Sequence, residues 1–179
     1  MLLALKDVAA WDNPWYAKWI DRLTGSLGTV HGELILSNGE RLTSLWDCGL
    51  CLDYRTEGYV PGWWWFVDVG GEKWEPAIRN WFDGEKGCKY DAIGLLRFVA
   101  SNLGLPILPP VSGTRYWCTE SVQSALNICG KYYVQRWMAS PNSFVKNLRP
   151  AMTRSMPNSF AEVVKPVDTA YRNRYFDKQ

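Results

Sequence analysis

The chain has 179 residues, of which 47% are hydrophobic and 21% charged, a composition typical of one globular domain with a single core. The net charge of +2 is too small to indicate binding to nucleic acid or to an anionic membrane surface. No apolar run reaches the roughly 20 residues of a membrane span, and the first residues lack the basic-then-apolar plan of a signal peptide. We therefore expect a cytoplasmic protein with no nucleic-acid partner and no integral membrane segment.

The first half of the sequence predicts one helix followed by an antiparallel sheet. Asn13-Pro14 is a typical helix start, with Asn13 as the N-cap, and Gly25 ends the segment. Tryptophans at 15 and 19 recur at helical spacing, and we expect them to pack in the core. Strand-like segments then follow at 29–36, 41–46, 50–54 and 63–69, with a turn at 37–40.

The second half of the sequence is mainly helical. The apolar spacing and the capping residues predict helices over 74–81, 92–103, 118–129 and 141–148. After residue 150 the chain becomes polar and irregular. The expected organisation is a single α+β domain over 1–150 and a loosely packed C-terminal extension over 151–179.

The cysteines do not indicate a metal site or a disulfide framework. There are five of them, and an odd number in a chain without an export signal argues against such a framework. Cys48 and Cys51 form a CxxC pair, but zinc needs two more ligands, and the chain has no second CxxC. A redox CxxC usually opens a helix, whereas this pair lies among strand-like residues. We therefore expect no metal and no cofactor.

Cys118 is the cysteine best placed for chemistry. It begins a predicted helix, and a helix N-terminus lowers the pKa of a thiol and so favours the nucleophilic thiolate. A cysteine nucleophile also needs a base that titrates near neutral pH, and His31 is the only histidine in the chain. A purely structural cysteine at the helix start is the alternative.

His31 lies on a predicted strand together with Glu33. Because side chains alternate along a strand, these two residues share one face. A carboxylate in this position can orient the imidazole, which is the third role in a catalytic triad. The alternative is a surface-facing pair on a half-exposed strand.

Several short motifs occur in a fixed order over roughly residues 13–148. They are the tryptophans at 15 and 19, Gly25-Ser26, His31-Gly32-Glu33, the tryptophans at 63–65, Tyr90-Asp91-Ala92-Ile93-Gly94, Tyr116-Trp117-Cys118-Thr119-Glu120 and Ser140-Pro141. This order resembles that of the permuted NlpC/P60-type papain-like hydrolases, the YaeF/YiiX-like group, in which the histidine strand precedes the cysteine helix. Gly32 replaces the apolar residue usual between His and Glu, and Thr119 replaces the commoner Ser.

The resemblance implies a circularly permuted papain-like fold, with an antiparallel sheet packed against helices and the cysteine at a helix N-terminus. It implies that Cys118 is the nucleophile, whose backbone N–H donates to the oxyanion, and that His31 is the base. Glu33 is the expected orienting residue. Ser44 or Thr43 is the alternative, because related enzymes take the third polar group from the next strand.

Three aromatic residues are the expected substrate-binding residues: Tyr116, Trp117 and Trp46. For Tyr116, packing in the core is the alternative. The resemblance also implies a hydrolase that cleaves an amide or ester through a thioester intermediate, with a peptide, a peptidoglycan stem or a lipid-like amide as substrate.

The origin of the chain affects the expected substrate, and other function classes stay open. A phage-encoded enzyme, delivered by lysis or in a virion, would act on cell-wall peptide. The alternatives to an enzyme are a non-catalytic module of the same fold that binds lipid or a partner protein, and a phage structural protein.

Overall fold

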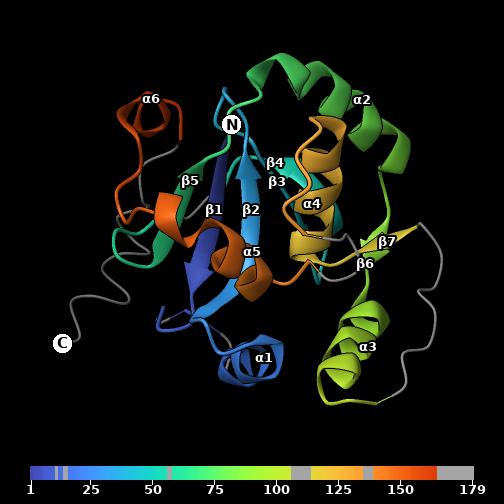
Figure 1. The fold of residues 1–179 in the computed structure, drawn as a ribbon. Helices are drawn as coiled ribbons and strands as arrows, with labels where there is room; N and C mark the ends of the chain where they lie inside the picture. The colour runs from blue at the N-terminus through green and yellow to red at the C-terminus, as the bar shows by residue number, and fades with distance from the viewer. Residues whose placement is uncertain (11, 14–15, 56–57, 106–113, 135–138, 165–179) are drawn as a thin grey trace.

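The computed structural model shows an α+β protein, and it describes all residues except 11, 14–15, 56–57, 106–113, 135–138 and 165–179 (Figure 1). The centre is a five-stranded antiparallel sheet in the order β4-β3-β2-β1-β5. The strands are β1 (Leu2–Asp7), β2 (Thr29–Ile35), β3 (Arg41–Leu45), β4 (Gly49–Asp53) and β5 (Trp64–Asp68). The predicted antiparallel sheet is therefore confirmed, and four of its strands lie where the sequence indicates.

The helices gather on one face and at both ends of the sheet (Figure 1). Helices α4 (Cys118–Ile128) and α5 (Pro141–Leu148) cover one face, and α4 contacts both β2 and β3. Helix α2 (Glu75–Glu85) follows a 3₁₀ turn over Glu72–Trp74 and lies at one end. Helices α1 (Ala17–Thr24) and α3 (Ala92–Asn102) lie at the other end, where they contact each other. The remaining elements are the short parallel strands β6 (Lys89–Tyr90) and β7 (Arg115–Tyr116), a 3₁₀ turn over Arg149–Ala151, and α6 (Asn158–Ala161).

The sheet separates two apolar clusters. The larger one joins Leu3 and Leu5 of β1 to Val122 and Leu126 of α4 and to Phe144 of α5. The smaller one lies on the other face and joins Leu2, Ala4, Tyr59, Trp64 and Phe160. Alternate residues of β1 enter the two clusters, so this central strand is buried on both faces.

The N-terminal part differs from the sequence prediction in two ways. The apolar run at 2–5 is the central strand of the sheet, which the sequence did not reveal because a strand buried on both faces does not alternate. Helix α1 begins at Ala17 and not after Asn13, whose side-chain amide donates to the carbonyls of Asp7 (2.7 Å) and Val8 (3.0 Å). Asn13 therefore holds the loop after β1 and does not cap the helix, while residues 14–15 lie outside the described part of the chain.

Part of the predicted C-terminal extension packs on the sheet. Thr153 pairs with Phe66 of the edge strand β5, and the guanidinium of Arg154 lies 3.5 Å from the centroid of the Trp65 ring. Phe160 is buried in the smaller cluster. Residues 151–164 therefore add to the core and cover an open sheet edge, and the rest of the extension lies outside the described residues.

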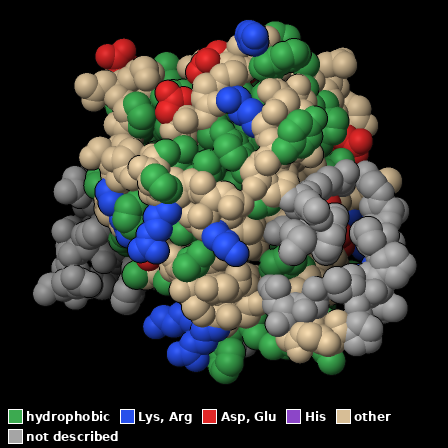
Figure 2. Space-filling view, viewed as in Figure 1, with side chains coloured by type: hydrophobic (Ala, Val, Ile, Leu, Met, Phe, Trp, Pro, Cys, Tyr) green, Lys and Arg blue, Asp and Glu red, His purple; other side chains and the backbone are tan. Residues whose placement is uncertain are grey.

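The surface carries scattered basic and apolar groups. On the face shown in Figure 2, Lys and Arg side chains gather over α1 and over the segment that follows α5. Trp19 of α1 is 56% exposed, contrary to the expected core packing, and Arg22 lies over its ring at 5.7 Å from the centroid. Among the residues that the structure describes, no helix has both the length and the apolar character of a membrane span.

Candidate active site

Cys118 is the first residue of α4, and its sulfur lies between two diverging strands. Strands β2 and β3 pair only at Leu34↔Leu42 and Ile35↔Arg41, so they separate toward the start of β2. The N-terminus of α4 packs against both strands there. The Glu120 carboxylate accepts a hydrogen bond from the Trp117 amide (3.4 Å) and so helps to cap the helix. The first-turn amides of α4 have no acceptor within the helix, which favours an anion beside them.

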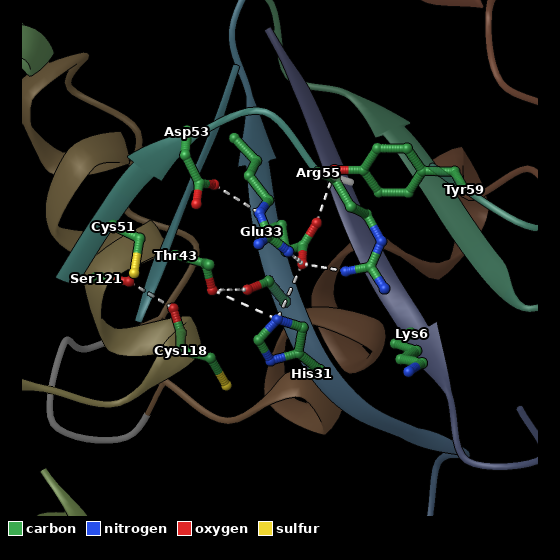
Figure 3. Close-up of polar contacts among 12 residues, drawn as sticks. Lys6, His31, Glu33, Thr43, Cys51, Asp53, Arg55, Tyr59, Cys118 and Ser121 are labelled. Atoms are coloured by element: carbon green, nitrogen blue, oxygen red, sulfur yellow. Dashed lines mark hydrogen bonds and ion pairs between the residues drawn. The ribbon is translucent and has the colours of Figure 1, made fainter. Parts of the chain in front are cut away.

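His31 lies on β2 between the sulfur of Cys118 and the carboxylate of Glu33 (Figure 3). Its Nε2 atom is 3.1 Å from Oε1 of Glu33 and 3.5 Å from Oγ1 of Thr43. The other ring nitrogen, Nδ1, faces Cys118 (Figure 3). Each nitrogen therefore has its own partner, which sets the orientation of the ring.

The charges of Cys118 and His31 stabilise each other. Burial alone would raise the pKa of the Cys118 thiol, but the His31 imidazolium and the backbone amides of Gly32 and Thr119 hold it below its ordinary value. Burial alone would lower the pKa of His31, but the Cys118 thiolate and the Glu33 carboxylate raise it to about 9. The arrangement favours a thiolate–imidazolium pair near neutral pH.

Glu33 is completely buried and is surrounded by hydrogen-bond donors. Its Oε1 atom accepts from Nη1 of Arg41 and from Nη1 of Arg55, both at 2.8 Å, and its Oε2 atom accepts from the Tyr59 hydroxyl at 2.6 Å. Burial would raise the pKa of Glu33, but Arg55, His31 and Arg41 hold it well below its ordinary range. The carboxylate is therefore ionised beside the imidazole, and the alternative of a surface-facing pair does not fit this burial.

The structure places Thr43 and Ser44, the two alternatives to Glu33 as the polar partner of His31, in different environments. The Thr43 hydroxyl faces His31 and donates to the carbonyl of Gly32 (2.9 Å). The Ser44 hydroxyl donates to the carbonyl of Tyr116 (2.7 Å), on the other side of β3. Glu33 and Thr43 therefore both contact the imidazole, and Ser44 does not.

Four residues around the site have roles that sequence reasoning did not assign. Arg55 and Tyr59 come from the loop after β4, where no periodicity places a side chain. Arg55 is further held over the Trp64 ring at 4.8 Å from its centroid. Arg41 is the first residue of β3, and only the strand register reveals that it reaches Glu33. Gly32 contributes a backbone amide, which no side-chain pattern reveals.

The three predicted substrate-binding aromatics have different environments. Tyr116 and Trp117 are buried in the core, so neither lines an open surface. Trp117 packs against Gly94, where a Cβ would lie 2.6 Å from the indole, and its Nε1 donates to the carbonyl of Ala139 (2.7 Å). Trp46 is 75% exposed and packs against Tyr90, with 5.6 Å between ring centroids. Of the three, only Trp46 therefore has a side chain open to solvent.

The CxxC pair has a different role from those considered in the sequence. Cys48 and Cys51 form a disulfide in the β3–β4 hairpin, contrary to the expectation of no disulfide framework. Gly49, at φ 72°, allows the tight turn that brings them together. Within the described part of the chain, no group of three or more His, Cys, Asp or Glu side chains is arranged to hold a metal ion.

Comparison with protein-family models, with curated proteins and with solved structures finds no match to this chain. The interpretation of the site therefore depends on its own geometry and charges.

Proposed function

We propose that the protein is a cysteine hydrolase that cleaves an amide or ester bond through a thioester intermediate. The observation that carries this proposal is the position of His31 between the Cys118 sulfur and the buried Glu33 carboxylate (Figure 3). A nucleophile at a helix N-terminus, a base beside it and an orienting carboxylate are the three parts that acyl transfer needs. The antiparallel sheet with the cysteine helix on its face also supports a permuted papain-like fold.

The proposed reaction has two steps. In the first, the Cys118 thiolate attacks the carbonyl carbon, and the imidazolium of His31 gives its proton to the leaving nitrogen or oxygen as the thioester forms. In the second, neutral His31 takes a proton from water, the resulting hydroxide attacks the thioester, and the acid and the thiolate are released. Backbone amides of the first turn of α4, including that of Cys118, are placed to stabilise the oxyanion.

The substrate belongs to one of the classes that such chemistry serves, namely a peptide, a cell-wall peptide stem or a lipid-like amide. Trp46, which is exposed and packs against Tyr90, is the aromatic side chain that we propose for substrate contact. A non-catalytic module that binds lipid or protein through the same fold is the competing function, and loss of the thiol separates the two.

The test compares Cys118→Ala with the matched control Cys129→Ala, whose thiol lies near the other end of α4 and has a raised pKa because of burial. We expect iodoacetamide at pH 7 to label Cys118 of the wild type in preference to Cys88 and Cys129, as measured by peptide mass spectrometry. We also expect a burst of p-nitrophenol from p-nitrophenyl acetate. Cys129→Ala should keep both signals, and Cys118→Ala should lose both while remaining folded, as circular dichroism measures. Hydrolysis that survives in Cys118→Ala, or labelling without preference, would contradict a catalytic role.

A further inference from the structure

Helix α4 rests directly on the backbone of Gly32. Gly32 lies between His31 and Glu33 on β2. Because side chains alternate along a strand, a side chain at 32 would point to the opposite face of the sheet from His31 and Glu33, toward α4. A Cβ at this position would lie 2.5 Å from Cγ2 of Thr119 and 3.3 Å from Cδ2 of Leu5. Its φ is outside the left-handed region, so the backbone conformation itself would accept any residue. The glycine is required here by space and not by backbone conformation.

The methyl group that touches Gly32 cannot easily turn away. The Thr119 hydroxyl is completely buried and donates a short hydrogen bond to the carbonyl of Ala139. Rotating the side chain to move Cγ2 away from β2 would break this bond and leave a buried hydroxyl without its acceptor. The absence of a side chain at 32 is therefore what allows α4 to sit this close to β2.

This depth controls how the backbone of Gly32 meets the nucleophile. Because β2 and β3 have separated here, the Gly32 carbonyl accepts from the Thr43 hydroxyl, and its amide lies close enough to the sulfur of Cys118 to favour the thiolate. The same strand carries His31 on its other face. A shift of α4 away from β2 would lengthen the sulfur's contacts with both the Gly32 amide and the imidazole.

We infer that Gly32 and Thr119 act as a coupled positioning pair, in which the absence of a side chain at 32 leaves room for the methyl of 119, so that α4 sits close enough to β2 for the Gly32 amide to lie beside the Cys118 sulfur. This inference rests on the proposed function and adds residues that contact the nucleophile through the backbone. Thr119→Ser keeps the hydroxyl that bonds Ala139 and removes only the methyl, so it creates the space that an alanine at 32 needs.

The experiment titrates the thiolate of the full-length protein by its absorbance near 240 nm, in wild type, Gly32→Ala, Thr119→Ser and the double variant. Gly84→Ala is the matched control, because a Cβ at Gly84 meets nothing within 4 Å. We expect Gly32→Ala to raise the Cys118 pKa by about one unit, since the Gly32 amide and the imidazole then lie farther from the charged sulfur. Labelling by iodoacetamide below this pKa should slow about tenfold in parallel. The double variant should titrate like Thr119→Ser alone, and Gly84→Ala should titrate like the wild type.

A wild-type thiolate titration in Gly32→Ala, or a double variant that recovers nothing, would overturn the inference. If Gly32→Ala does not fold, the double variant is compared with Thr119→Ser alone, and a double variant that also fails to fold overturns the pairing. A wild-type Cys118 that titrates at the ordinary thiol pKa contradicts the proposed function instead. In that case the melting temperatures of the same four proteins still test whether the substitutions at 32 and 119 compensate.

Discussion

The Nε2 atom of His31 lies 3.1 Å from Oε1 of Glu33, and Nη1 of Arg41 approaches the same oxygen at 2.8 Å. The carboxylate therefore serves two purposes with one atom. It pairs with Arg41 of the sheet and with Arg55 of the loop after β4, and so joins the two. It also stabilises the charged form of the His31 imidazole. Stability and the charge state of His31 are therefore linked at this oxygen.

The single histidine gives a direct test of the charge state of the site. We expect the Hε1 resonance of His31 to titrate with a midpoint of about 9 in the wild type. Because this pKa is raised above the ordinary histidine value, His31 adds to stability below pH 6.5, and this contribution declines as the pH rises through about 9. NMR titration measures the midpoint, and Cys118→Ala should lower it. A wild-type midpoint near 6.5 would contradict the ion pair.

Glu33→Gln should be strongly destabilising. It leaves Arg41 and Arg55 beside a neutral amide in a buried position, and breaking a buried ion pair in this way costs about 3–5 kcal/mol. The pKa of Glu33 is held low in the folded state, so its contribution to stability is present above pH 4.5 and declines as the pH falls through its folded pKa.

Asp53→Asn is the control for Glu33→Gln, because Asp53 also pairs with Arg41 but its side chain is 49% exposed. Such an exposed pair contributes about 0–1 kcal/mol. Urea denaturation at pH 7 compares the two variants, and equal losses would show that Glu33 is not the centre of the network. The His31 midpoint should fall in Glu33→Gln and stay unchanged in Asp53→Asn.

Thr43→Val and Ser44→Ala test which hydroxyl on β3 belongs to the site. Each removes a buried donor to a backbone carbonyl, so each should cost about 1–3 kcal/mol of unfolding free energy. Only Thr43→Val should also change the His31 titration and slow p-nitrophenyl acetate hydrolysis, because only Thr43 faces the imidazole. A kinetic effect of Ser44→Ala equal to that of Thr43→Val would reverse this assignment.

Phe160→Ala tests whether the segment after residue 150 is part of the core. Phe160 is 6% exposed and packs in the smaller apolar cluster, so its removal should cost about 3–5 kcal/mol. Val163→Ala, at a side chain that is 37% exposed, should change stability by no more than about 0.5 kcal/mol. Thermal melts of the two variants give the comparison, and an unchanged Phe160→Ala would show that 151–164 is only loosely attached.

The disulfide in the β3–β4 hairpin can be tested by counting thiols. Cys48 and Cys51 form a disulfide, and Cys88, Cys118 and Cys129 are the three cysteines outside it. Titration with a thiol reagent in denaturant should therefore give three thiols without reductant and five after reduction. Five thiols in the unreduced protein would mean that the pair is open.

The sequence predicted the parts of the site that depend on local periodicity. The two-residue spacing of His31 and Glu33 placed both on one face of a strand, and the structure brings them into contact. The sequence did not predict that Arg55 and Tyr59 contact Glu33. Both lie in a loop, where side chains follow no periodic pattern, and only the folded sheet brings this loop next to Glu33. The sequence prediction placed Trp117 at a binding surface, although only the packing against Gly94 reveals that this side chain is buried. Gly32 and Thr119 are the two residues that differ from the pattern of the family that the sequence resembles. They lie against each other in the structure, which the sequence could not reveal because they are far apart along the chain.

The order of the elements along the chain also determines when the site can form during synthesis. The sheet is incomplete until residue 68 has left the ribosome, because β1 needs β5 as its second neighbour. The strand that carries His31 is by then already paired with β1. Cys118 emerges some 50 residues later and reaches His31 only when α4 packs against β2 and β3. A nascent chain therefore brings His31 and Glu33 together first and adds Cys118 last, which limits the time in which a thiolate at Cys118 could exist on an unfinished protein.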